Sequence, residues 1–179
     1  TSGTILKCIE DFVDRYENVP IAGMTYFMFV KRKAVWPPFV LNTRVYSNML
    51  IQTDACDPIG KPYRNEGYFN DDTDLCLRVL KDGFCTILFN AFLIFKSTTM
   101  SVKGGNTPHY INDNGRWKMA EELRQKHPDV TRVGRRWDRW QHYVDYRPFK
   151  NNRLIKKSDT PEYAGVDNYG MELIEGIKS

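Results

Sequence analysis

The 179-residue chain lacks several features that would place it in a common protein class. No apolar run reaches the ~18 residues that a membrane-spanning helix needs. Residues 1–7 lack the apolar segment of a secretory signal peptide. We therefore expect no contact with a membrane and a location in the cytoplasm. Internal repeats and low-complexity tracts are also absent, which excludes repeat arrays and biased linkers.

Cysteine and histidine are both scarce: the chain has four cysteines and three histidines. No two cysteines form a C-x-x-C pair, and none lies beside a histidine at the spacing typical of a zinc site. Three of the cysteines lie in apolar stretches: Cys8, Cys76 and Cys85. We expect these three to be buried, reduced thiols.

Apolar residues make up 41% of the chain and aromatic residues 13%, which suits a globular domain with a hydrophobic core. Residues 1–157 are expected to form that domain, and residues 158–179 a polar tail. Periodicity and breaker residues predict helices over residues 5–16, 70–80, 116–126 and 135–146. Apolar stretches predict strands over residues 21–30, 40–51 and 84–95, the last two with breaks near Ser47 and Asn90. This alternation indicates an α/β or α+β class with partly parallel strands.

Positive charge is concentrated near the end of the chain. Residues 132–157 hold nine Lys and Arg against two Asp, a balance of +7, so the rest of the +4 chain is −3. This asymmetry favours a polyanionic partner such as DNA. Aromatic residues recur there at every third position: Trp137, Trp140, Tyr143, Tyr146 and Phe149. One interpretation is a helix docked by its aromatic side chains with solvated arginines, and the other is a nucleic-acid surface. The predicted DNA-binding residues are Arg135, Arg136, Trp137, Arg139 and Trp140.

Three carboxylates crowd the expected start of the 70–80 helix, namely Asp71, Asp72 and Asp74. One Asp suffices to cap a helix, and negative charge suits the positive end of its dipole. Three in four residues repel one another and need a counter-charge, which Arg78 or a ligand would provide. The cluster is therefore open to a structural or a functional interpretation.

The pattern Asp71-Asp72-x-Asp74-Leu75-x-x-Arg78 resembles the acidic E-D-x-D-L-x-x-R signature of GT-A glycosyltransferases. The resemblance is closest to the TET-associated glycosyltransferases, and it extends from about residue 5 to residue 157. Further matching segments are residues 23–26, 88–92, 96–100, 103–107, 137–146 and 148–149. Asp71 departs mildly from the family pattern, since most members carry Glu there.

The resemblance implies a GT-A-like mixed sheet flanked by helices and the transfer of a sugar from a nucleotide sugar to a hydroxymethylated pyrimidine in DNA. Asp72 would be the general base and Asp71 its catalytic neighbour, because a placed carboxylate can take the proton of an acceptor hydroxyl. The implied substrate-binding residues are Asp74, Arg78, Lys103, Gly104, Gly105 and Asn106. The implied cofactor is a divalent metal, Mn or Mg, with His109 as a ligand, and the implied donor is a UDP-sugar. The family is found in bacteriophages, and in eukaryotes beside base-modifying dioxygenases. A phage-encoded chain would act in the cytoplasm of an infected host cell.

The family pattern includes a D-x-D metal motif at the end of a strand in an N-terminal nucleotide-binding βαβ part. No convincing D-x-D of that kind occurs here, so we expect this βαβ part to be absent and the chain to carry the acceptor side. Two other hypotheses stay open: a GT-A transferase acting on a saccharide or protein, and a nucleic-acid-binding module without catalysis.

Overall fold

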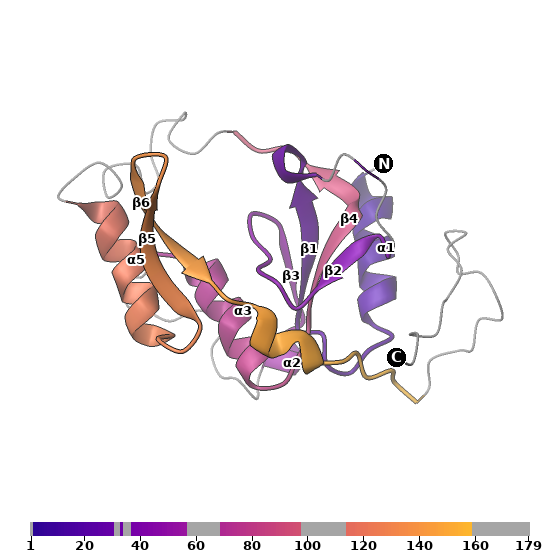
Figure 1. The fold of residues 1–179 in the computed structure, drawn as a ribbon. Helices are drawn as coiled ribbons and strands as arrows, with labels where there is room; N and C mark the ends of the chain where they lie inside the picture. The colour runs from indigo at the N-terminus through magenta and orange to yellow at the C-terminus, as the bar shows by residue number, and fades with distance from the viewer. Residues whose placement is uncertain (1, 31–32, 34–36, 57–68, 98–113, 159–179) are drawn as a thin grey trace.

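A computed structural model describes residues 2–30, 33, 37–56, 69–97 and 114–158, and it has mixed α/β architecture (Figure 1). The helices are α1 (Ser2–Val13), α2 (Thr53–Cys56), α3 (Asp71–Lys81) and α5 (Gly115–Lys126), with 3-10 turns η1 (Phe27–Phe29) and η3 (Arg147–Asn151). The strands are β1 (Ile21–Tyr26), β2 (Phe39–Leu41), β3 (Met49–Ile51), β4 (Thr86–Ile94), β5 (Thr131–Arg136) and β6 (Arg139–Val144). The predicted α/β class is therefore confirmed. No helix among the described residues is long and apolar enough to cross a membrane.

The central sheet has four strands in the order β2-β4-β1-β3. β1 and β4 run parallel in the middle, and the short strands β2 and β3 pair antiparallel at the two edges. This arrangement confirms the partly parallel sheet. Its two central strands are apolar because helices cover both of their faces.

Helices α1 and α3 cover opposite faces of this sheet (Figure 1). On one face, Phe12 of α1 packs edge-on against Phe89 of β4, with ring centroids 5.4 Å apart. On the other face, Leu75 of α3 packs with Ile21 of β1, and both are fully buried. The left-handed conformation of Gly83 (φ 86°) ends α3, as its position in the sequence predicts. The expected buried thiols are confirmed, since Cys8, Cys76 and Cys85 are all buried and free.

An irregularity interrupts the pairing of β1 with β4. Met24 is paired with Phe89, but the next residue, Thr25, is paired with Leu93. The backbone N–H groups of Asn90 and Ala91 both donate to the carbonyl oxygen of Pro38, at 2.7 and 3.1 Å. The break predicted near Asn90 is therefore a bulge that stays within one strand.

Two predictions about secondary structure are wrong. Strand β1 ends at Tyr26, and η1 follows with exposed side chains, so the strand expected up to residue 30 is too long. Residues 135–146 were predicted as a helix, but residues 135–144 belong to the antiparallel hairpin of β5 and β6, and residues 145–146 follow it. The aromatic residues recur at every third position, and the segment was interpreted as a helix. In the structure, the segment forms two strands that pair with each other. The turn residues Trp137 and Asp138 are not an Asn-Gly or Asp-Gly pair, the usual signal of a two-residue hairpin.

The hairpin and α5 form a third layer outside α3 (Figure 1). Leu77 and Leu80, on the side of α3 turned away from the sheet, pack against Val130 and Phe149. Helix α5 packs across both β5 and β6. The hairpin is thus fixed to the same helix whose first turn carries the acidic cluster.

Candidate functional site

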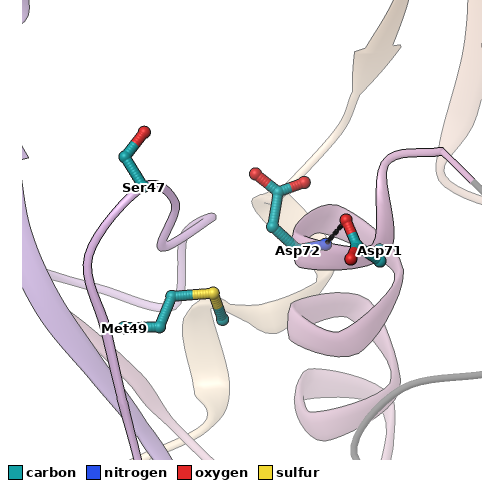
Figure 2. Close-up of a pocket in the computed structure, with 4 residues that line it drawn as sticks. All are labelled: Ser47, Met49, Asp71 and Asp72. Atoms are coloured by element: carbon teal, nitrogen blue, oxygen red, sulfur yellow. Dashed lines mark hydrogen bonds between the residues drawn. The ribbon is translucent and has the colours of Figure 1, made fainter. Parts of the chain in front are cut away.

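An open pocket of about 390 Å³ lies where the first turn of α3 faces the segment before β3 (Figure 2). Its lining residues are Ser47, Met49, Asp71 and Asp72. Gly23 of β1 allows that segment to come close, because a Cβ atom at this position would lie 2.1 Å from the carbonyl oxygen of Asn48. The wall of the pocket opposite α3 therefore depends on the absence of a side chain at Gly23.

The start of α3 is fixed by Asn70. This residue is left-handed (φ 81°, ψ 30°), a conformation that asparagine adopts more readily than most residues. Its carbonyl oxygen accepts the backbone N–H of Asp74 at 2.9 Å, and its side-chain Nδ2 donates to the carbonyl oxygen of Met119 in α5 at 3.1 Å. The acidic first turn is thereby anchored to a second helix.

Asp71 and Asp72 have different orientations. Asp71 Oδ1 accepts the backbone N–H of Asp72 at 3.1 Å, and its side chain is turned back along its own helix (Figure 2). Asp72 Oδ1 accepts the backbone N–H of Thr73 at 2.7 Å and its hydroxyl at 3.1 Å. The Asp72 carboxylate projects into the space facing Ser47 (Figure 2). Asp72 Oδ2 accepts no hydrogen bond from the described part of the chain, so this oxygen is the one best placed to take a proton.

Asp74 and Arg78, predicted to bind substrate, lie behind this surface. Arg78 Nε donates to Asp74 Oδ2 at 3.1 Å, and His127 Nε2 lies 2.8 Å from Asp74 Oδ1. Asp74 is 1% exposed and His127 is 2% exposed. This geometry gives Asp74 a structural role between α3 and α5. A direct contact of Asp74 or Arg78 with substrate stays a prediction.

Three side chains that interact with one another or with Asp72 were not singled out in the sequence, namely Arg44, Tyr46 and His142. A fourth, Tyr146, was noted only as one of the regularly spaced aromatic residues. Burial raises the pKa of Tyr146, and the Asp72 carboxylate adds to this effect. Burial also raises the pKa of Tyr46, where Arg44 opposes and Asp72 reinforces the shift. These couplings place the rings within electrostatic reach of Asp72. One sequence signal exists for Arg44 and Tyr46: they are two positions apart, so in an extended segment their side chains lie on the same side.

The charge of Arg44 acts on Tyr46 and on His142 of the hairpin. Its guanidinium lies over the ring of Tyr46, 4.4 Å from the centroid. Burial lowers the pKa of His142 in β6 to about 4, and the positive charge of Arg44 acts in the same direction. His142 is therefore neutral at neutral pH, and the charge of Arg44 reaches the inner end of the hairpin.

The five predicted DNA-binding residues lie together on the hairpin: Arg135, Arg136, Trp137, Arg139 and Trp140. All five are exposed. The Arg136 guanidinium lies 4.1 Å from the centroid of Trp137, and Arg135 lies 5.9 Å from that of Trp140. The structure thus gathers arginines and indole rings on one projecting ribbon.

Other predicted residues lie outside the described ranges, namely Lys103, Gly104, Gly105, Asn106 and His109. Among the described residues, no group of three or more His, Cys, Asp or Glu side chains is arranged to hold a metal. Two carboxylates that already cap a helix do not complete the oxygen shell of Mn or Mg. The described residues alone therefore do not fit a divalent metal, and its binding stays a prediction.

Residues 2–105 match the family model of the TET-associated glycosyltransferases, and this match covers more than half of the chain. The chain belongs to the TET-associated glycosyltransferase family. The match confirms the resemblance of the sequence to this family over these residues, and its extension to residue 157 stays a prediction. In this TET-associated glycosyltransferase, the matched region includes the central sheet, α3 and the pocket with Asp72, whereas α5 and the hairpin follow it. No curated protein and no solved structure matches the sequence.

Proposed function

We propose that this TET-associated glycosyltransferase transfers a sugar from a nucleotide sugar to the hydroxymethyl group of a pyrimidine in DNA. The observation that carries the proposal is the Asp72 carboxylate, which lies in a pocket beside an arginine-rich hairpin. Family membership supports sugar transfer, and the charge of the hairpin supports DNA as the acceptor.

Asp72 would act as the general base. The oxygen of the acceptor hydroxymethyl group forms a bond to the anomeric carbon of the sugar, while the bond from that carbon to the nucleotide diphosphate breaks. The hydroxyl proton passes to Asp72, and the diphosphate leaves with the bonding electron pair. A hydroxyl is a poor nucleophile without a base, so the position of Asp72 at the pocket is the central feature of the proposal.

Asp72 is preorganised for this role. Its Oδ1 atom is held by the backbone and hydroxyl of Thr73, which fixes the carboxylate against the first turn of α3. A pocket of about 390 Å³ falls in the range of small-molecule sites, roughly 300–1,000 Å³, and can take one extruded base. The proposed general base, Asp72, therefore lies at the edge of the pocket that would take the acceptor.

The hairpin would bind the DNA backbone. Arg135, Arg136 and Arg139 are exposed, and cationic side chains of this kind neutralise phosphates and release their counterions. Trp140 adds an indole face on which a base can stack. Phosphate contacts of this type would hold the duplex next to the pocket without reading its sequence.

On the donor side, we propose a nucleotide sugar, with a UDP-sugar as the first candidate, and Mn or Mg at its diphosphate. The family resemblance assigns the donor contacts to Lys103, Gly104, Gly105, Asn106 and His109, outside the described residues. The transfer of the hydroxyl proton to Asp72 involves only the acceptor and a side chain of α3.

The experiment that tests the function is a transfer assay on matched acceptors. Because donor binding by this chain is expected to be weak, the protein is incubated with a large excess of a UDP-sugar, Mn²⁺ and duplexes that carry hydroxymethylcytosine, hydroxymethyluracil or unmodified cytosine. The nucleosides are then identified by mass spectrometry. We expect a hexose adduct only on the hydroxymethylated duplexes. An adduct on an oligosaccharide or peptide acceptor, with none on DNA, would assign the enzyme to a different acceptor class.

A further inference from the structure

The turn between β5 and β6 has an unusual composition. Its two residues, Trp137 and Asp138, both have positive φ, 48° and 58°. Two-residue hairpin turns of this kind belong to type I′ and are normally made of Asn-Gly, Asp-Gly or Gly-Gly. A bulky residue with positive φ is strained, so Asn or Gly would fit position 137 better than tryptophan does. Backbone strain of this sort clusters at functional sites, where the surrounding structure maintains it.

The tryptophan does not compensate for this strain by packing into the protein. Trp137 is 75% exposed, against 41% for Trp117 of α5 and 39% for Trp140 of β6. Arg135 Nη2 donates to Asp138 Oδ1 at 2.6 Å across the turn, which holds the tip in shape. The Arg136 guanidinium lies over the exposed indole. The hairpin therefore presents a large aromatic ring at its tip, flanked by cations.

The opposite end of the hairpin packs on α3, the helix whose first turn lines the pocket. Val144 at the end of β6 and Tyr146 just past it pack with Leu77 and Leu80 of α3. The Asp72 carboxylate also contributes to the raised pKa of Tyr146. The four residue steps from the turn residue Asp138 to His142 of β6 span roughly 14 Å at ~3.4 Å per step. The turn lies on the same side of the molecule as the carboxyl end of β1 (Figure 1). One element thus connects the exposed indole to the region of the candidate base.

A duplex fits this arrangement. A two-stranded β-ribbon enters the major groove, which is about 12 Å wide, and its arginines then face phosphates on both sides. A pyrimidine within the duplex cannot reach a carboxylate set in a pocket, because its edge lies at the floor of that groove. Enzymes that act on such a base extrude it from the stack. Apolar or aromatic wedges inserted between base steps unstack the duplex and favour the opening.

We propose that Trp137 inserts into the base stack of duplex DNA at the place left by the pyrimidine that is extruded toward Asp72. This inference rests on the proposed function, because it takes the modified duplex as the acceptor. The tryptophan occupies the vacated space, and the arginines of the hairpin hold the adjoining phosphates.

The test uses a duplex with 2-aminopurine next to hydroxymethylcytosine. Fluorescence anisotropy of an end label measures binding, and 2-aminopurine emission measures unstacking. With the native chain we expect binding together with a several-fold rise in emission. With Trp137→Asn we expect weaker binding and, at protein concentrations high enough to saturate the duplex, the emission of the free duplex. Because asparagine suits positive φ, this variant should melt at the same temperature as the native chain or higher, which excludes a loss of folding.

Two further variants complete the comparison. Trp137→Phe keeps an aromatic wedge and should retain most of the rise in emission. Trp117→Ala removes another exposed tryptophan, which lies on α5, and should change neither the anisotropy nor the 2-aminopurine emission. Two outcomes would overturn the insertion of Trp137 and leave the proposed function in place. One is an equal rise in 2-aminopurine emission with Trp137→Asn and with the native chain, and the other is no rise when the native chain is bound. A native chain that does not bind the duplex even at low salt would overturn the DNA acceptor, and the wedge with it.

Discussion

His127 Nε2 lies 2.8 Å from Asp74 Oδ1 in the protein interior, between the end of α5 and the first turn of α3. The same carboxylate receives Arg78 Nε on its other oxygen. Both Asp74 and His127 are almost fully buried, so this contact lies beneath the pocket surface. The acidic signature therefore divides into Asp72, which faces the pocket, and Asp74, which holds the helices together.

This division predicts the effect of Asp74→Ala. Removing one partner of a buried, hydrogen-bonded charged pair typically costs about 3–5 kcal/mol, so we expect a loss of stability of that order in urea unfolding. The matched control is Asp129→Ala, which removes the partner of Lys81 in an exposed pair and should cost less than about 1 kcal/mol. If Asp74→Ala stays as stable as the native chain and loses activity, Asp74 contacts the substrate instead.

Asp72→Asn should abolish most of the transfer activity. An amide cannot accept the hydroxyl proton, so we expect turnover to fall by roughly 100-fold or more with little change in melting temperature. Asp71→Asn is the control, because its side chain is turned back toward the helix (Figure 2). We expect a smaller loss from it, although the sequence placed both residues in the catalytic group. Turnover within a few-fold of native for Asp72→Asn would exclude Asp72 as the base.

DNA binding should weaken steeply with salt. Each phosphate contact releases counterions, so the charge-reversed variant of Arg135, Arg136 and Arg139 should show weaker binding and a shallower slope of log K against log salt. Fluorescence titration from low to moderate salt measures this slope. Lys7 on α1 offers a control, since its side chain is exposed but belongs to the opposite layer of the fold. A slope identical in the triple variant and the native chain would exclude phosphate contacts by the hairpin.

His142 predicts a dependence of stability on pH. Its pKa is about 4 in the folded chain against an ordinary 6.5, so between these values the unfolded chain binds a proton that the folded chain does not. Its contribution to stability is therefore present above pH 6.5 and is lost as the pH falls toward 4. We expect His142→Gln to flatten the fall in melting temperature over this window, whereas Tyr143→Phe on the same strand should leave it unchanged. Identical pH profiles for His142→Gln and the native chain would contradict the assignment.

Donor binding should be weak in this chain. The described residues bring two carboxylates to the pocket and no group of three or more metal-binding side chains, whereas a hard cation at a diphosphate needs several oxygen ligands. Calorimetric titration with a UDP-sugar and Mn²⁺ should therefore give little heat, while DNA binding persists. Micromolar binding of the donor would show that residues such as Asp54 or His109 complete a donor site.

The sequence predicted elements whose signals are local. The helix with the acidic start, its end at Gly83 and the buried strand from Ile21 were all predicted, because periodicity and breaker residues are encoded in short windows. The hairpin was missed because its turn carries Trp137 and Asp138 in place of the usual turn residues. In the site, the motif singled out Asp71 and Asp72, which the structure places at the pocket, and their catalytic roles stay predictions. Ser47 and Met49 could not be predicted, since only tertiary folding brings them near α3.

The bulge in β4 reverses the two faces of that strand. Before it, the odd-numbered residues Ile87 and Phe89 belong to the core beneath α1, and after it the even-numbered Phe92 and Ile94 pack against that same core. A register slip of three residues has this effect because side chains alternate with a period of two. Leu93 of β4, 46% exposed, is an outcome of this inversion, since without it an odd-numbered residue would point inward. The number of extra residues in the bulge therefore decides which apolar side chains reach solvent at the carboxyl end of β4. The hydrophobicity of the strand matters less for this outcome.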